Sequence, residues 1–205
     1  MQTIATLNKE MTSLFKQLIM KIGKEVVKDF YIPDHLKPIY NNLLLYFTGN
    51  EGPYDLDKGI YLYGEYGIGK TVTMKIFSKF LSTLWNFGPN NFGMTSIEQI
   101  LETLKADGNL QKYGLNWDGD KERPFSTCIN ELGKTVDEKY YGTRAQSVIN
   151  SMLMVRYEIF QNRKAMTHAT SNYRPSQLEG FDGAILDRFN EMFNFIPVGG
   201  RTFRK

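Results

Sequence analysis

The residues best suited to chemistry form a glycine-rich stretch that satisfies the pattern G-x-x-x-x-G-K-S/T: Gly64, Glu65, Tyr66, Gly67, Ile68, Gly69, Lys70 and Thr71. Because glycine has no Cβ and reaches positive φ at little cost, this loop can turn sharply and bring its backbone close to an anion. Its N–H groups, with the positive end of a following helix, then face phosphate groups. In such loops the lysine, here Lys70, reaches the β- and γ-phosphates, and the hydroxyl of Thr71 binds Mg²⁺. The stretch predicts a nucleoside triphosphate site.

Polar residues also end two later apolar runs, over 125–133 and 164–172. P-loop ATPases carry two acidic residues at the end of an apolar strand: the first holds Mg²⁺ through water, and the second polarises the attacking water. In this chain the first position is Asn130 and the second is Glu131. Asn172 ends the later run, at the carboxyl end of a predicted strand, where ligands bind in open α/β sheets.

Two further residues have a structural and a functional interpretation. Arg188 is either an exposed residue that forms a salt bridge or a charge that completes the ATP site of a neighbouring subunit. His168 lies within a predicted strand, and no histidine or cysteine sits at ligand spacing from it. We therefore expect His168 to be a packing residue rather than a metal ligand.

The elements that position these residues alternate between strand and helix. Apolar periodicity predicts strands over 59–63, 125–133 and 164–172, and helices over 71–84 and 142–163. A Thr95–Glu98 capping box predicts the start of another helix, which ends near Lys105 and lies between the first two strands. A helix-rich segment from Ser176 and a last short strand with a basic tail, over 194–205, complete the order. The polar residues 106–124 predict an exposed, irregular excursion. This alternation predicts an α/β fold with a parallel sheet, covered on both faces, and a phosphate site at the carboxyl ends of its strands.

The residues before the P-loop form a separate, helical region in our interpretation. Residues 1–30 and 36–46 predict two helices, and a turn-rich linker follows. We place the boundary near Leu56, with a partner-docking region over 1–56 and the ATPase domain over 57–205. The lysines of the first helix are interpreted as a solvated face in preference to a DNA contact.

Composition narrows the possible classes further. The 205 residues are 41% hydrophobic, carry a net charge of +3 and include a single cysteine, Cys128. An intramolecular disulfide and a cysteine-rich zinc module are excluded, and a reducing, cytoplasmic setting fits. No apolar run approaches the length of a membrane span, and the first residues lack a signal-peptide pattern.

Taken together, the motifs resemble a known family. The order GEYGIGKT, INELG, RYEIF, THATSN, LDRF and GGRTFR is similar to the DnaC/IstB branch of AAA+ ATPases, above all to phage-type DnaC-like helicase loaders. The similarity covers about residues 56–205. It implies a P-loop NTPase (AAA+) three-layer sandwich with a parallel sheet, preceded by a small helical N-terminal region.

The resemblance also implies roles for single residues and for partners. Glu131 would be the catalytic carboxylate, and Asn172 would orient water near the γ-phosphate. Arg188 would act in trans as an arginine finger, and Arg204 would contact nucleotide or DNA. Family members use ATP and Mg²⁺, self-associate, bind single-stranded DNA and deliver a replicative helicase in the cytoplasm of a bacterium or a phage-infected host.

Two departures from the family pattern modify these expectations. Asn130 stands where the family has aspartate. The residue that holds Mg²⁺ through water, alongside the Thr71 hydroxyl, is therefore neutral instead of negatively charged. We expect weakened Mg²⁺ affinity and slow turnover. The chain stops at Lys205, which leaves no room for the helical lid of larger AAA+ proteins.

Three alternatives remain beside the helicase loader. An IstB-like transposition helper would use the same ATPase with a transposase as partner. A slowly hydrolysing or non-hydrolysing ATP-binding interaction module is suggested by Asn130. A small-molecule kinase needs an arginine-rich lid, and residues 106–124 contain no arginine before Arg123, which argues against it.

Overall fold

The computed structural model describes residues 1–85, 88, 90–107, 116–118, 121–123, 125–133, 139–140, 143–162 and 165–203. The chain divides into two compact units. The first unit comprises Met1–Lys58, Glu65–Asn91 and Val198–Lys205, and the second comprises Gly59–Gly64 and Phe92–Pro197. The predicted boundary near Leu56 stays a prediction.

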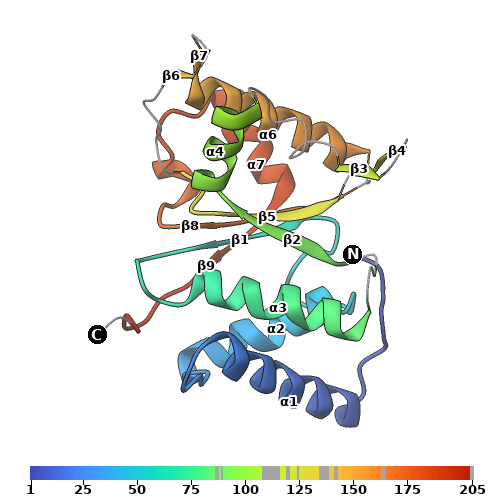
Figure 1. Ribbon diagram of the computed structural model, residues 1–205. Coiled ribbons are helices and arrows are strands. Elements are labelled where there is room, and N and C mark those ends of the chain that lie inside the picture. The colour runs from blue at the N-terminus through green and yellow to red at the C-terminus, as the bar shows by residue number, and fades with distance from the viewer. Residues whose placement is uncertain are drawn as a thin grey trace. The chain divides into compact units, whose positions relative to one another are not determined.

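A five-stranded sheet forms the centre of the second unit (Figure 1). Its strands are β1 (Gly59–Tyr63), β2 (Phe92–Ser96), β5 (Ser126–Asn130), β8 (Thr167–Ser171) and β9 (Phe193–Pro197). They lie in the order β2-β5-β8-β1-β9, and every neighbouring pair is parallel. The carboxyl ends of all five strands therefore meet at one edge, and β8 lies between β1 and β5. This confirms the predicted α/β class with a parallel sheet.

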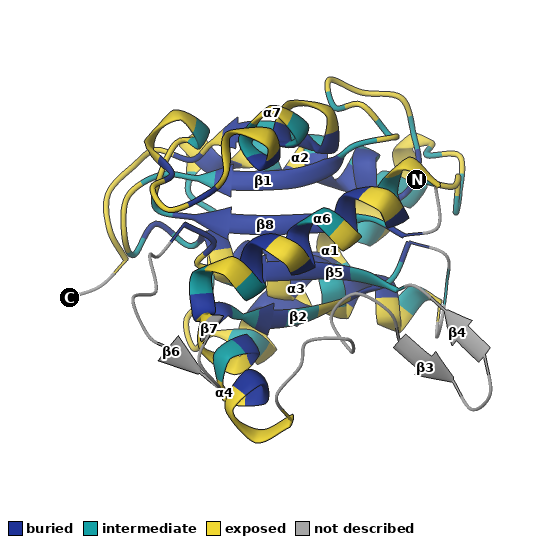
Figure 2. Ribbon diagram, turned by 90° about the horizontal axis from the view of Figure 1, so that it is seen from above, coloured by how far each residue is buried: buried dark blue, intermediate teal, exposed yellow. Residues whose placement is uncertain are grey.

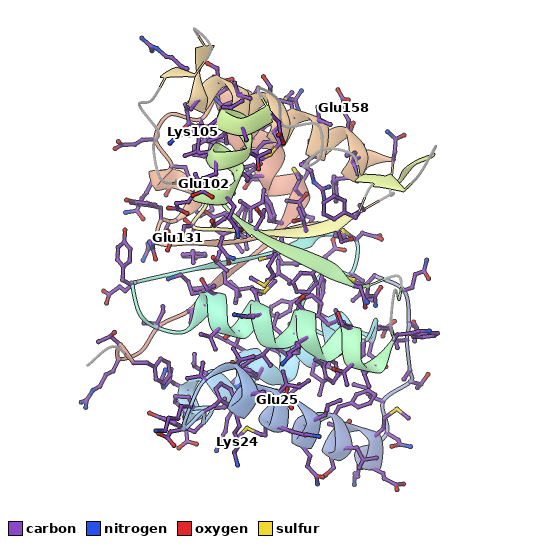
Figure 3. All side chains as sticks on the ribbon, viewed as in Figure 1. Lys24, Glu25, Glu102, Lys105, Glu131 and Glu158 are labelled. Carbon is purple, nitrogen blue, oxygen red and sulfur yellow. The ribbon has the colours of Figure 1, made fainter. Side chains whose placement is uncertain are left out.

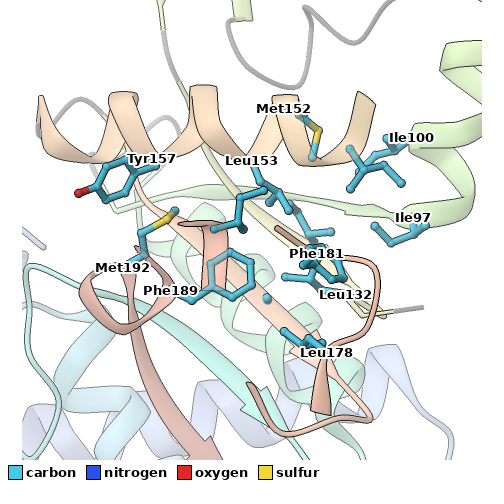
Figure 4. Packing of buried hydrophobic residues seen from close by; sticks show 14 of the residues in the cluster. Ile97, Ile100, Leu132, Met152, Leu153, Tyr157, Leu178, Phe181, Phe189 and Met192 are labelled. Atoms are coloured by element: carbon cyan, nitrogen blue, oxygen red, sulfur yellow. The ribbon is translucent and has the colours of Figure 1, made fainter. Parts of the chain in front are cut away.

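Three helices of this unit cover one face of the sheet (Figure 1): α4 (Ile97–Asp107), α6 (Ala145–Gln161) and α7 (Gly183–Met192). Their apolar side chains pack with alternate residues of the strands, among them Tyr61, Ile129 and Ala169. Figure 4 shows Leu153 of α6 and Phe189 of α7 in this cluster. Because side chains alternate across a strand, the neighbouring residues in each strand point to the opposite face. Along β8 all five residues are buried, whereas β1 and β5 are buried except at end residues, and Figure 2 shows these strands mainly in dark blue.

Helices form most of the first unit: α1 (Lys9–Val26), the short η1 (Asp34–Leu36), α2 (Lys37–Phe47) and α3 (Lys70–Leu84). The Asn8 side chain caps α1 by accepting a hydrogen bond from Met11 N at 2.8 Å. Phe15 of α1 meets Phe80 of α3 edge to face, with ring centroids 5.4 Å apart. Aromatic packing thus joins the N-terminal helices to the helix that follows the P-loop.

Several predicted elements differ from the structure. Residues 1–7 are not helical, and α6 begins at Ala145, after the two-residue strand β7 (Thr143–Arg144) that pairs with β6 (Lys139–Tyr140). Within the predicted excursion, β3 (Asn116–Asp118) and β4 (Lys121–Arg123) form an antiparallel pair.

The strand β2 was not predicted, and the capping box lies one residue later in the sequence than predicted. Ser96 and Gln99, rather than Thr95 and Glu98, form that box: Ser96 N donates to Gln99 Oε1 at 3.0 Å, and Gln99 N donates to Ser96 Oγ at 3.2 Å. Thr95 instead pairs with Ile129 within the sheet. Strand pairing therefore ends at Ser96, and α4 begins at the next residue, Ile97.

None of the helices in the described ranges combines the length and apolar character that a membrane crossing requires.

Candidate functional site

Glycines of the predicted P-loop have positive φ. Gly67 and Gly69 have φ of 78° and 89°, and Gly69 caps the start of α3 in the left-handed region. Thr73 N donates to Gly69 O at 2.8 Å, which is the first backbone bond of the helix. A side chain at either glycine would face the steric penalty of positive φ. The loop therefore leads directly into a helix N-terminus, as an anion site needs.

Lys70 and Thr71 occupy the first turn of α3. Lys70 is only 7% exposed, and its Nζ donates to the carbonyl of Glu65 at 2.7 Å. Thr71 is exposed. The lysine thus folds back over its own loop, so its ammonium group is held close to the backbone that would surround a phosphate.

A second group of predicted residues meets at the carboxyl edge of the sheet in the other unit. Asn130 ends β5 and is half-buried, while Glu131 follows it and is exposed (Figure 3). Asn172 directly follows β8, the neighbouring strand. The first motif residue, Gly64, also lies at this edge, because its N–H donates to Ser171 O at 3.3 Å. The chain therefore enters the P-loop from the edge that carries these polar residues.

Glu131 has an unusual backbone for a residue with a side chain. Its φ is 58°, in the left-handed region. The Glu131 N–H donates to Thr170 Oγ1 at 3.3 Å, and Leu132 N donates to Thr170 O at 2.9 Å. Backbone strain of this kind persists when surrounding contacts hold it, and it clusters at functional sites.

Thr170 is a residue that the sequence did not single out. Its hydroxyl donates to Asn130 Oδ1 at 3.2 Å, in addition to accepting from Glu131 N. One hydroxyl thereby contacts both residues, Asn130 and Glu131, that stand where P-loop ATPases carry two acidic residues. The signal available in the sequence was only that a threonine precedes the polar end of a strand.

Gly133 completes the turn after Glu131. Its φ is 106°, and a Cβ there would overlap Leu178 Cδ2 and lie 3.1 Å from a ring carbon of Tyr173. The segment that follows β8 packs against this glycine, so only a residue without a side chain allows the close approach.

Arg188 lies on α7 and contacts residues of its own unit. Its Nη1 donates to Met154 Sδ at 2.7 Å, and its Cζ lies 4.9 Å from the centroid of the Tyr157 ring. Tyr157 in turn donates its hydroxyl to Glu191 Oε2 at 2.7 Å. The in-trans role of Arg188 stays a prediction. Arg204 lies outside the described residues.

His168 is a buried residue in the middle of β8. Its Nδ1 accepts from Ile60 N at 3.0 Å, and its ring lies 4.7 Å from that of Phe92. Burial, with a smaller effect from the charge of Arg156, lowers its pKa from 6.5 to about 3. The imidazole is therefore neutral and supports the sheet, as expected for a packing residue.

Arg156 is a second buried basic residue, and the sequence did not reveal it. Its guanidinium donates to Thr167 Oγ1 at 2.9 Å, to Phe125 O at 2.9 Å and to Met166 O at 2.7 Å. Burial lowers its pKa from 12.5 to about 10, so it remains cationic near neutrality. These bonds join α6 to the amino ends of β5 and β8, at the opposite edge from Glu131.

Each of the two predicted Mg²⁺ residues, taken by itself, carries an oxygen of the kind that Mg²⁺ prefers. Among the residues that the structure describes, no three His, Cys, Asp or Glu side chains are grouped so that they could hold a metal ion. Mg²⁺ does not require such a group, because it keeps several waters and takes few protein oxygens beside the phosphates of a nucleotide. The Thr71 hydroxyl and the Asn130 amide oxygen are oxygens of this kind.

Solved structures of DnaI, DnaC and DnaA have a similar fold. The DnaI structure is 18% identical, with 88% of this chain and 93% of that chain covered and a TM-score of 0.59. The DnaC helicase loader is 17% identical, with 84% and 95% covered and a TM-score of 0.56. AMPPCP-bound DnaA from Aquifex aeolicus is 14% identical, with a TM-score of 0.57; 85% of this chain is covered but only 50% of DnaA, so the chain spans about half of that protein's length.

No protein-family model matches the sequence, and no curated protein does. At these identities the likeness shows the fold, which is that of the AAA+ P-loop domains of DnaC, DnaI and DnaA. The resemblance inferred from the motifs is thus confirmed at this level.

Proposed function

We propose that this chain is an ATP-dependent loader of a replicative helicase, of the DnaC-like AAA+ type. The observation that carries the proposal is the sheet edge at which Gly64, Asn130, Glu131 and Asn172 meet and from which the chain enters a P-loop with left-handed glycines. A phosphate loop that follows the end of one strand in the chain, and a carboxylate that follows the end of another, are parts that ATP hydrolysis needs.

Each residue has a proposed role in that reaction. The loop N–H groups and Lys70 bind the β- and γ-phosphates of ATP. Glu131 polarises the attacking water, and Asn172 orients it. Arg188 of a neighbouring subunit stabilises the charge of the transition state, and Arg204 contacts nucleotide or DNA.

Mg²⁺ would be held by the Thr71 hydroxyl and, through water, by Asn130. When bound, it supplies charge neutralisation at the β- and γ-oxygens. Because Asn130 is neutral and its oxygen already accepts from Thr170, we propose weak Mg²⁺ affinity and slow hydrolysis. This makes a slowly hydrolysing ATP-binding interaction module the second candidate function.

The partners are proposed from the comparisons. One DnaA neighbour is described as bound to AMPPCP and single-stranded DNA, and DnaC is described as a helicase loader. We propose that this chain likewise self-associates on single-stranded DNA with ATP and delivers a helicase, in the cytoplasm of a bacterium or a phage-infected host.

ATP hydrolysis by the purified chain, with and without single-stranded DNA, tests the proposal. We expect hydrolysis that DNA stimulates and that Lys70→Ala abolishes. Lys75→Ala is the matched control, because it removes an exposed lysine from the same helix.

A pull-down from the native host with ATP is expected to recover a helicase. Recovery of a transposase would favour the IstB-like alternative. A chain that stays monomeric with ATP and DNA and contacts no helicase would refute the loader. ATP binding without phosphate release, unaffected by Glu131→Gln, would establish the interaction module instead.

A further inference from the structure

The C-terminal segment returns to the P-loop within the first unit. Phe203 N donates to the carbonyl of Gly67 at 2.9 Å. A Cβ built on Gly69 would lie 3.4 and 3.7 Å from two ring carbons of Phe203, so the ring lies against the loop at van der Waals distance. Residues more than 130 positions apart in the sequence are thereby joined at the nucleotide loop.

A second aromatic ring lies beside the first. Tyr31 meets Phe203 edge to face, with centroids 5.9 Å apart and an interplanar angle of 75°. Tyr31 is 60% exposed and Phe203 is 43% exposed. The edge-to-face arrangement is one that aromatic pairs prefer, and it fixes the orientation of both rings while a large part of each remains accessible to a ligand.

A close backbone contact anchors this arrangement. Gly200 has φ of 125°, and a Cβ there would overlap the His35 ring. His35 belongs to η1, four residues after Tyr31. The C-terminal segment 200–203 thus contacts both the segment 31–35 and the P-loop. More than one contact therefore positions the two rings.

The tail leaves the phosphate-binding groups of the loop available. Its hydrogen bond uses the Gly67 carbonyl, which is an acceptor, whereas a phosphate is bound by N–H donors. A nucleotide whose phosphates occupy the loop carries its base on a ribose attached to the α-phosphate, so the base must lie beside the loop. The Phe203 ring, with the Tyr31 ring against it, also lies beside the loop.

We propose that Tyr31 and Phe203 bind the purine base of the nucleotide. The inference rests on the proposed function, since it takes the P-loop to hold the phosphates. Stacking of a base on an aromatic side chain accounts for a roughly 5- to 150-fold change in affinity on substitution by alanine. The C-terminal segment then determines how strongly the base, as distinct from the phosphates, contributes to binding.

The test compares a triphosphate that carries a nucleoside with one that carries none. Dissociation constants for ATP and for inorganic tripolyphosphate, both with Mg²⁺, are measured by calorimetry for the full chain and its variants. Phe203→Ala and Tyr31→Ala are each expected to weaken ATP binding about 5- to 150-fold and to leave tripolyphosphate binding unchanged. Phe203→Tyr keeps an aromatic ring and is expected to bind ATP as the natural chain does.

Trp85→Ala is the matched control, because Trp85 is another exposed aromatic residue of the same unit, at the end of α3. It is expected to bind both ligands normally. Thermal unfolding of each variant shows that the fold is retained.

Two results would overturn the inference. Equal weakening of ATP and tripolyphosphate in Phe203→Ala would mean that the tail only shapes the loop, and unchanged ATP binding in both alanine variants would mean that the rings do not touch the base. Failure of the proposed function has a different signature: the natural chain would bind neither ligand, or Lys70→Ala would bind both as well as the natural chain does.

Discussion

Thr170 Oγ1 donates a hydrogen bond of 3.2 Å to Asn130 Oδ1 while it accepts one of 3.3 Å from Glu131 N. Residues on two neighbouring strands are joined at the carboxyl edge of the sheet by this hydroxyl. It holds the side chain of Asn130, the predicted Mg²⁺ position, and the backbone of Glu131, the predicted catalytic carboxylate. Because Glu131 has a left-handed backbone, the support from Thr170 stabilises a conformation that costs about 1–3 kcal/mol.

Thr170→Val tests whether this support positions Glu131. Valine has the same shape but no hydroxyl, so both bonds are lost. We expect the hydrolysis rate to fall about tenfold or more, with little change in the affinity for ATP, and Thr170→Ser to restore the rate. A steady-state assay with separate nucleotide-binding measurements distinguishes the two quantities.

Thr167→Val is the control for Thr170→Val, since it removes a hydroxyl from the opposite end of the same strand. It is expected to lower stability through Arg156 but not the rate per folded molecule. An equal loss of rate in both variants would argue against a positioning role.

Asn130→Asp is expected to strengthen Mg²⁺ binding and to speed hydrolysis. The carboxylate adds a full charge near the proposed ion and can still accept the bond from Thr170. A titration of ATPase activity with Mg²⁺ measures both effects. The idea is wrong if the Mg²⁺ dependence and the rate are the same in the variant and the natural chain.

His168 predicts a loss of stability in mild acid. Burial lowers the folded-state pKa to about 3 from 6.5, so the fold favours the neutral imidazole. This contribution is fully present above pH 6.5 and is lost as the pH falls toward 3. Between pH 7.5 and pH 5 it amounts to about 2 kcal/mol.

Urea unfolding of the natural chain and of His168→Gln over this pH range isolates the histidine. The carboxylates titrate in both proteins, and glutamine does not titrate. The free-energy difference between the two is expected to shrink by about 2 kcal/mol as the pH falls from 7.5 to 5. Parallel curves would show that the imidazole is not buried in its neutral form.

Arg156→Met is expected to destabilise the chain by about 3 kcal/mol or more, because the carbonyls of Phe125 and Met166 lose their buried donors. Arg156→Lys keeps the charge but not the planar fork that meets three acceptors, so it restores only part of this loss. Chemical denaturation measures both, with the exposed Arg144→Ala as the control. A change below 1 kcal/mol for Arg156→Met would contradict a structural role.

Arg188 can be tested in trans by mixing two inactive variants. Arg188→Ala retains a complete P-loop, and Lys70→Ala retains the arginine. If Arg188 serves the neighbouring site, the mixture is expected to hydrolyse ATP although each variant alone does not. Arg188→Ala also removes the contact with Tyr157, so its thermal stability is expected to fall by an amount that corresponds to about 0.5–1 kcal/mol. No activity in the mixture would assign Arg188 to packing of α7 on α6.

The P-loop could be recognised from the sequence alone, because its glycines, Lys70 and Thr71 lie within one short stretch. The positive φ of the glycines and the start of the helix at Lys70 fit these residue types. It also indicated β1, β5 and β8, whose apolar runs are buried strands. Strand β2 escaped detection because Phe92–Ser96 contains a glycine and two hydroxyl residues, and its strand form depends on pairing with β5.

The residues that support the site became apparent only from the packing of distant segments. The strand order brings Thr170 beside Asn130, places Arg156 under the amino ends of two strands and lets His168 accept a hydrogen bond from β1. In the other unit, the fold returns Phe203 to the P-loop. Apart from Arg156 and Met166, which are ten residues apart, these pairs are distant in sequence, and a local pattern carries no information about long-range pairing. The nucleotide loop was therefore evident from eight consecutive residues, whereas its aromatic neighbours and the support of Glu131 arise from how distant segments pack.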